Sequence, residues 1–329
     1  LITLVGFIGI LKVSFVGYVV DDLPEKDPIY TDLKFFEKTF GGVLPFEISI
    51  DTKKENGVFA ENAKTLYKMK RLQDSVGKYP EFSKPVSIVE AVKFSYQAYR
   101  GGNPNSYRLP TISDLKKISE YSGSLSSQDN RLKSFIDSSK RITRISFQMA
   151  DVGSQKIKEL TSELRPKIDS IFDPKEYKVS MTGHSLVFLK SNDYLLQNLL
   201  ESLVIEIILI ALVGMALFRS VRIIILSKLP CLIPLIITAG VMGFMDIRFK
   251  PSTILIFSIA FGISSDGTIY FLTKYRQELK KKAGDAFLAI SEAIHDTGLS
   301  MIYTSVILFF GFIIFSVSSF GGKIGRAHV

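Results

Sequence analysis

One acidic residue, Asp266, lies inside the long apolar run ILIFSIAFGISSDGTIYFLTKY. A carboxylate at membrane depth is costly unless it is paired, hydrated or protonated. An acid that gains and loses a proton at that depth can couple proton flow to the movement of neighbouring helices. We therefore predict that Asp266 is a proton-coupling residue. The simpler alternative is a structural polar anchor between helices.

Two hydroxyl groups of another apolar run are predicted to lie at the level of Asp266. At a rise of about 1.5 Å per residue, Asp266 is roughly 22 Å from the outer end of its run at Pro251. Thr304 and Ser305 are roughly 10–12 Å from the cytoplasmic end of the last run. We expect them to contact Asp266. The alternative is that each hydroxyl bonds the backbone of its own helix.

Glu206 is a second candidate for proton coupling. It lies roughly 16 Å from the outer end of the run 195–217. The alternative is an ion pair with a lysine or arginine from a half of the protein that this sequence does not contain. Lys228 is near a helix end, where we expect its amine to reach toward the interface.

Prolines and glycines in these runs predict kinks and close packing. Pro230 and Pro234 remove backbone hydrogen bonds from the run 223–245. Glycine lets two helices approach closely, and the candidates are Gly240, Gly243, Gly262 and Gly267.

The elements that hold these residues are apolar helices. Of 329 residues, 47% are hydrophobic, and the excess lies in residues 1–20 and 195–320. Crossing ~30 Å of hydrocarbon takes about 20 apolar residues. We predict a polytopic α-helical membrane protein with spans at 1–20, 195–217, 223–245, 251–273 and 297–320. We expect the first span to be truncated. The tail 323–329, KIGRAHV, resembles translated sequencing adapter, and we expect it to lie outside the fold.

Basic loops set the predicted orientation. FRSVR follows the run 195–217 and KYRQELKKK follows the run 251–273, so both loops share one side, which the positive-inside bias makes cytoplasmic. Residues 21–194 then lie outside, in the periplasm of a bacterium whose inner membrane holds the helices. The charged segment 274–296 predicts an amphipathic helix at the cytoplasmic face, or only a connector.

Residues 21–194 read as a polar, globular domain. Alternation and helical spacing predict strands at 46–52, 142–149 and 177–182, and helices at 58–76, 87–100, 111–121 and 153–171. This order fits an inserted α+β domain of the split βαβ, ferredoxin-like type.

Several function classes lack support in the sequence. The net charge of +9 is concentrated in loops beside apolar runs, which does not favour nucleic-acid binding. One cysteine and three scattered histidines form no metal-ligand spacing. No GxxxxGK[ST] loop and no clustered catalytic set is present. We expect no enzyme, no metal and no cofactor, with a proton gradient as the energy source.

Three strings in order resemble the resistance–nodulation–division superfamily, in the branch of the mycobacterial membrane protein large (MMPL) transporters and hopanoid exporters with a sterol-sensing-like helix bundle. They are LFRSVRIIILSKLPCLIPLIITAGVMGF, PSTILIFSIAFGISSDGTIYFLTKYRQE and TGLSMIYTSVILFFGFIIFSVSSFGG. FGGVLPFEISID and MTGHS in the predicted periplasmic domain also resemble that branch. The resemblance covers nearly all of residues 1–322.

The resemblance implies a proton-driven secondary exporter of lipids or other hydrophobic compounds. Such exporters have two pseudo-repeated halves, each with a periplasmic porter domain, and this chain resembles one half, the second more than the first. Its implied partners are the missing half, membrane lipids, a hydrophobic substrate and further copies in an oligomer. Asp266 matches the first acid of the family's helix-four motif, while Gly267 replaces the frequent second acid and Tyr270 the frequent histidine.

Those two departures leave other functions open. One is a sterol-sensing-like receptor or scaffold that binds lipid without transporting it. Another is a protein-export component that resembles the proton-driven Sec accessory proteins.

Overall fold

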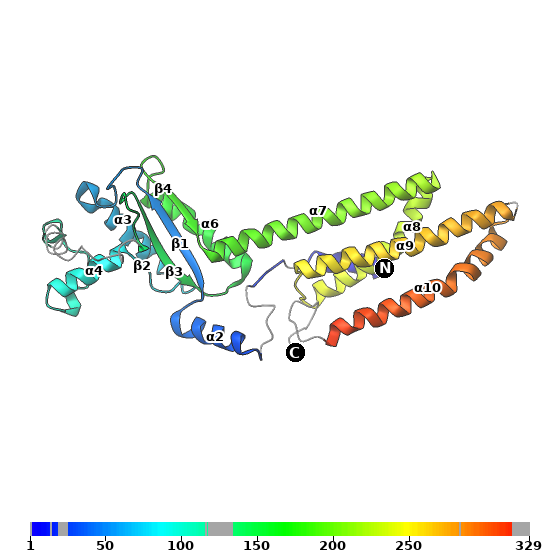
Figure 1. Cartoon of the computed structure of the whole chain (residues 1–329), viewed down its shortest axis with the longest axis horizontal. Coiled ribbons are helices and arrows are strands. Elements are labelled where there is room, and N and C mark those ends of the chain that lie inside the picture. The colour runs from blue at the N-terminus through cyan, green and yellow to red at the C-terminus, as the bar shows by residue number, and fades with distance from the viewer. Residues whose placement is uncertain are drawn as a thin grey trace. The chain divides into compact units, whose positions relative to one another are not determined.

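The computed structural model describes residues 2–13, 15–18, 26–115, 117, 134–282 and 284–317 (Figure 1). The chain divides into two compact units, described here one at a time. The helical unit comprises residues 1–17, 21–24 and 192–329, and the sheet unit comprises residues 18–20 and 25–191. The predicted adapter-derived tail, 323–329, lies outside the described residues.

The sheet unit contains a small four-stranded sheet. Its strands are β1 (Leu44–Asp51), β2 (Val86–Ser87), β3 (Ile142–Met149) and β4 (Lys178–Thr182). The order is β2-β3-β1-β4, and every neighbouring pair is antiparallel. Ile48 of the central strand β1 lies opposite Ile145 and Met181.

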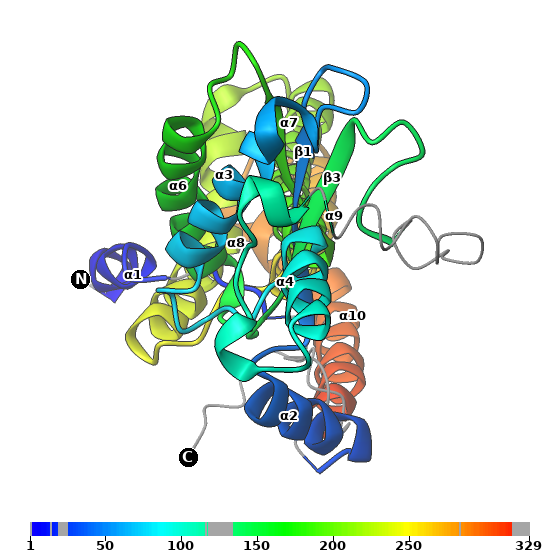
Figure 2. The ribbon, with the colours of Figure 1, turned by 90° about the vertical axis from the view of Figure 1, so that its left-hand side faces the viewer.

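Helices cover one face of this sheet. They include α3 (Ala60–Val76) and α6 (Gly153–Ile171), which Figure 2 shows on the same side of β1 and β3. Apolar residues recur on one face of α3 and one face of α6, and they pack with alternate residues of β1 and β3 in one core. Buried members of that core are Phe46, Ile48, Leu66, Met69, Ile145, Phe147, Leu160 and Leu164.

The structure confirms most of the local predictions for the sheet unit. Strand 142–149 and helix 153–171 have the predicted bounds, and the helix α4 (Ile88–Tyr99) matches the prediction at 87–100. Within the predicted helix 111–121, residues 112–115 are helical, and most of the rest lies outside the described residues. The two-residue strand β2, the short 3-10 helix η1 (Pro104–Ser106) and the helix α2 (Pro28–Phe40) were not predicted.

The helical unit is built from α1 (Ile2–Ile10), most of α7 (His184–Phe218), α8 (Val221–Phe244), α9 (Pro251–Lys281) and α10 (Ala286–Val317). Four of these helices, α7 to α10, are long and apolar enough to cross a membrane. The helices α7 and α9 contain the predicted runs 195–217 and 251–273. The helix α8 covers the run 223–245 up to Phe244, and α10 covers the described part of the run 297–320.

Two helix predictions were wrong in extent. Within the described part of the predicted span 1–20, the helix covers Ile2–Ile10, and the amides of Lys12 and Val13 bond three residues back. The amine of Lys12 lies 5.4 Å from the centre of the Phe244 ring. The segment 274–296 is not a separate helix. It is divided between the end of α9 and the start of α10, where Asp285 accepts hydrogen bonds from the amides of Phe287 and Leu288.

Glycines bring α1 and α8 into backbone contact. A Cβ atom on Gly240 would lie 2.5 Å from Cα of Gly6, and one on Gly6 would lie 3.0 Å from the carbonyl oxygen of Ile236. Neither position has room for a larger residue at this separation. The close approach predicted at Gly240 is therefore present, and its partner is α1.

Candidate functional site

Polar side chains lie at the contacts of α9 with its neighbours, and the first of them is Glu206 of α7. Its carboxylate accepts a hydrogen bond from the hydroxyl of Ser258 on α9. One turn further along α9, a Cβ on Gly262 would lie 3.1 Å from Oε1 of Glu206. Small residues spaced by four on α9 therefore leave room for this carboxylate. The alternative, an ion pair with a basic residue of the missing half, stays a prediction.

The second contact joins α8 and α9 around Lys228. Its side chain is buried, and its amine lies 5.9 Å from the centre of the Phe261 ring. The prediction that Lys228 reaches toward the interface was wrong, because it packs against α9. Within the described part of the chain, its Nζ has no hydrogen-bond acceptor.

Ser265 lies one turn beyond Phe261 on α9 and is only 1% exposed. Its hydroxyl also has no partner among the described residues. One turn further, Thr268 Oγ1 lies 3.4 Å from Sγ of Cys231 on α8. Phe261, Ser265 and Thr268 thus follow one face of α9, and two buried polar atoms without partners, those of Ser265 and Lys228, lie along this contact.

Asp266 lies on another face of α9, and this face is open. The carboxylate is exposed, and so are Leu255, Ile259 and Tyr270 at helical spacing along the same stripe. Leu255 and Ile259 are each 49% exposed and Tyr270 is 53% exposed. No described helix covers that stripe, and the role of Asp266 in proton coupling stays a prediction.

The predicted contact of Asp266 with Thr304 and Ser305 is not made. Thr304 donates to the carbonyl of Ser300 at 3.0 Å, and Ser305 donates to that of Met301 at 2.8 Å. A hydroxyl in an apolar helix satisfies itself most simply on its own backbone. The α10 helix meets α9 at Gly267 instead, where an added Cβ would lie 3.5 Å from Cε of Met301.

Ion pairs join the end of α9 to the start of α10. Lys274 lies 2.8 Å from Asp296, and Lys282 lies 3.4 Å from Glu292. His295 and these two acids place ligand atoms within 4.8 Å of one another. Both carboxylates already have lysine partners, so we assign no metal to this group.

Sequence reasoning did not single out Ser258, Phe261 or Ser265. The available signal was the spacing of small and hydroxyl residues at 258, 262 and 265, which indicates a face of α9 that accommodates another helix. Pro230 lies in α8 within one turn of Lys228, and Pro234 one turn further on.

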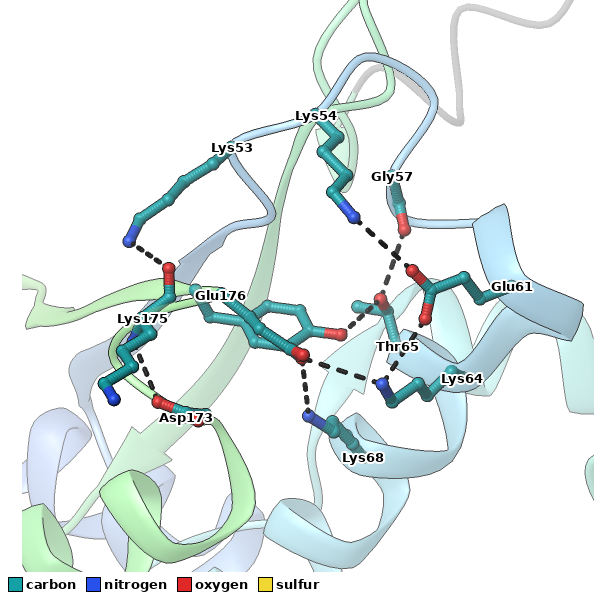
Figure 3. Close-up of polar contacts among 11 residues, drawn as sticks. Lys53, Lys54, Gly57, Glu61, Lys64, Thr65, Lys68, Asp173, Lys175 and Glu176 are labelled. Atoms are coloured by element: carbon teal, nitrogen blue, oxygen red, sulfur yellow. Dashed lines mark hydrogen bonds and ion pairs between the residues drawn. The ribbon is translucent and has the colours of Figure 1, made fainter.

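A polar network in the sheet unit fastens two of its loops (Figure 3). Glu61 pairs with Lys54 at 3.4 Å and with Lys64 at 3.3 Å, and Glu176 pairs with Lys64 at 3.6 Å. The hydrogen bond from Lys64 holds the pKa of Glu61 below its ordinary value. Lys53 donates to two carbonyl groups of the turn at 174–175. These bonds connect the loop after β1 to the turn before β4, so the network has a structural role.

Comparison with known proteins agrees with a membrane assignment. The model of the MMPL family matches residues 61–322. A protein of Methanocaldococcus jannaschii, described as membrane protein MJ1562, is 24% identical over 299 residues, which cover 88% of this chain and 73% of that protein. Because the family model matches most of the chain, this protein belongs to the MMPL family, within the resistance–nodulation–division superfamily.

Proposed function

We propose that this chain is part of a secondary exporter that is driven by protons and moves lipid-like or hydrophobic compounds. In this proposal it is not an enzyme, and it works in the inner membrane of a bacterium. The observation that carries the proposal is the position of Asp266, far from either end of α9 and on an open stripe of that helix.

An exposed carboxylate at membrane depth needs a cover. If the carboxylate of Asp266 faced lipid, its ionisation would cost several kcal/mol of free energy. We therefore infer that another protein surface or a water-filled cavity lies against the stripe. The other half of the protein, or a second copy, fits this requirement. Protonation of Asp266 would change the charge at that interface, and an interface that differs between two charge states can drive a conformational change.

Other parts of the chain have supporting roles in this proposal. Glu206, held by Ser258, is a second acid that a proton could reach, and Thr304 and Ser305 stay as candidates only if α10 moves. Pro230 and Pro234 weaken the backbone bonding of α8, which eases bending. Gly262 and Gly267 leave room at the contacts of α9 with α7 and α10.

We further propose that the sheet unit is a ferredoxin-like porter domain on the periplasmic side. The strand order β2-β3-β1-β4, with only antiparallel neighbours, supports that topology. The basic loops after α7 and α9 support the sidedness.

The test is proton flux in proteoliposomes that contain the protein with Asp266→Asn. A matched control is Asp246→Asn, which removes an acid from the loop between α8 and α9. We expect the Asp266 variant to insert normally and to lose substrate-dependent proton entry, and the control to keep it. Normal proton entry in the Asp266 variant would refute the mechanism.

A lipid-binding receptor without transport is the second candidate. The observation that favours it is the pair Gly267 and Tyr270, because related proteins often have an acid and a histidine at these two positions. If the wild-type protein binds a lipid-like ligand but moves no protons, this candidate replaces the exporter.

A further inference from the structure

The helix α2 carries an apolar face that is largely uncovered in the described chain, with three of its four residues exposed and Leu33 half-buried. Ile29, Leu33, Phe36 and Phe40 recur every three or four residues, which places them on one side of the helix. Ile29 is 60%, Phe36 51% and Phe40 59% exposed. The Phe36 and Phe40 rings stack at 5.2 Å, so the face presents a continuous aromatic surface.

Polar contacts hold α2 to the sheet unit by a different side. Glu37 pairs with Lys34 at 2.7 Å and accepts a hydrogen bond from the amide of Asp151 at 3.1 Å. Asp27 caps the first turn by accepting from the amide of Ile29, and Gly41 ends the helix at φ 76°. The ends and the polar side of α2 are therefore fixed, and the apolar side stays open.

Chain length limits how far α2 can lie from the membrane, and it permits α2 to reach the membrane surface. Phe15 packs edge-on against Phe249, in the loop between α8 and α9, at 5.7 Å. Pro28 follows Phe15 by thirteen residues in the sequence, and a fully extended chain covers at most ~3.6 Å per residue, or about 47 Å. That loop lies on the predicted outer side, so α2 must lie within this reach of the outer membrane surface.

We propose that α2 lies in the lipid–water interface of the outer leaflet, with Ile29, Phe36 and Phe40 in the acyl-chain boundary. An amphipathic helix with aromatic residues on one face and charges on the other prefers that environment. The partner is the lipid bilayer itself. The inference goes beyond the proposed export function and depends on it only for the side of the membrane. The consequence is that the sheet unit is held against the leaflet from which a lipid-like compound would enter.

Tryptophan fluorescence tests this proposal, because the chain has no tryptophan of its own. Phe36→Trp places a reporter on the proposed membrane face, and Phe94→Trp places one on α4, where Phe94 is 66% exposed. Each variant is reconstituted in phosphatidylcholine–phosphatidylglycerol vesicles, with and without brominated acyl chains. We expect brominated lipid to quench the reporter on α2 strongly and aqueous acrylamide to quench it weakly, with the reverse for the reporter on α4.

Two results would overturn the proposal. Equal acrylamide quenching of the two reporters would show that α2 stays in water. Protection from acrylamide without quenching by brominated lipid would show that protein, not lipid, covers the face. Phe40→Trp, one turn away, repeats the measurement if the first variant folds poorly. The same readout with Asp266→Asn in the background separates this proposal from proton coupling, since lipid contact of α2 does not require transport.

Discussion

Replacing Lys228 by methionine is expected to stabilise the helical unit. The amine is buried between α8 and α9 and has no acceptor among the described residues. A buried polar group without a partner costs ~1–3 kcal/mol in mutational data. Methionine is similarly long and flexible, so it can fill the space beside Phe261 without that cost. We therefore expect a gain of about 1–3 kcal/mol. At ~2–4 °C per kcal/mol, the unfolding midpoint should rise by roughly 2–12 °C.

The only cysteine of the chain provides the assay. Cys231 is 2% exposed and lies in the same contact, one turn from Lys228. A dye that fluoresces on reaction with thiols will therefore report the temperature at which α8 separates from α9. The wild-type protein and the variant are heated in the same detergent, and the two midpoints are compared.

Lys12→Met is the matched control. Lys12 also lies over a phenylalanine ring, that of Phe244, but it is exposed. Losing that contact should cost no more than about 1 kcal/mol. A lower midpoint for Lys228→Met than for the wild type would refute the reasoning, because it would mean that the amine has an acceptor, such as a bound water or a carboxylate, outside the described residues.

The remaining predictions concern helix packing and pH. Gly240→Val should lower the thiol-dye midpoint, because a side chain there meets the backbone of Gly6, whereas Gly311→Val should leave it unchanged, because nothing lies within 4 Å of that position. A hydrogen bond from Arg141 holds the pKa of Asp51 below its ordinary value, so this ion pair stabilises the sheet unit above about pH 4, and its contribution is lost as the pH falls further. When unfolding is followed by circular dichroism, Asp51→Asn should reduce the loss of stability that occurs as the pH falls below about 4. An unchanged loss of stability in this variant would contradict the role given to the Asp51–Arg141 ion pair.

Local patterns were sufficient to predict the long elements. Alternation at 142–149 and helical spacing at 153–171 are patterns among neighbouring residues, so they can be recognised in the sequence without knowledge of the tertiary structure. The helix α2 was missed although its signals are present, namely Asp27 as the cap, Pro28 in the first turn and Gly41 after the end. The sequence also contains signals for the break before α10. They are Gly284, which adopts φ 92°, and Asp285, which caps the next helix.

The sequence predicted which helix carries each residue, but not which neighbour its face of the helix meets. Lys228 was expected at the interface because it is near a helix end, and its actual position depends on how α8 and α9 cross. Thr304 and Ser305 were placed level with Asp266 by counting residues, and yet they bond their own backbone. Spacing says which residues share a face, but only tertiary packing decides which helix that face meets.

The three faces of α9 explain why one helix can hold several polar groups. Ser258 and Gly262 accommodate the Glu206 carboxylate, so this acid has a partner within the chain. Ser265 and Lys228 are both buried at the contact with α8, and neither has a partner among the described residues. Asp266 has no cover at all in the described chain. Among these groups, Asp266 is the one that lies on an open stripe, and in the proposed function it is therefore the group whose protonation is linked to the docking of another half or another copy.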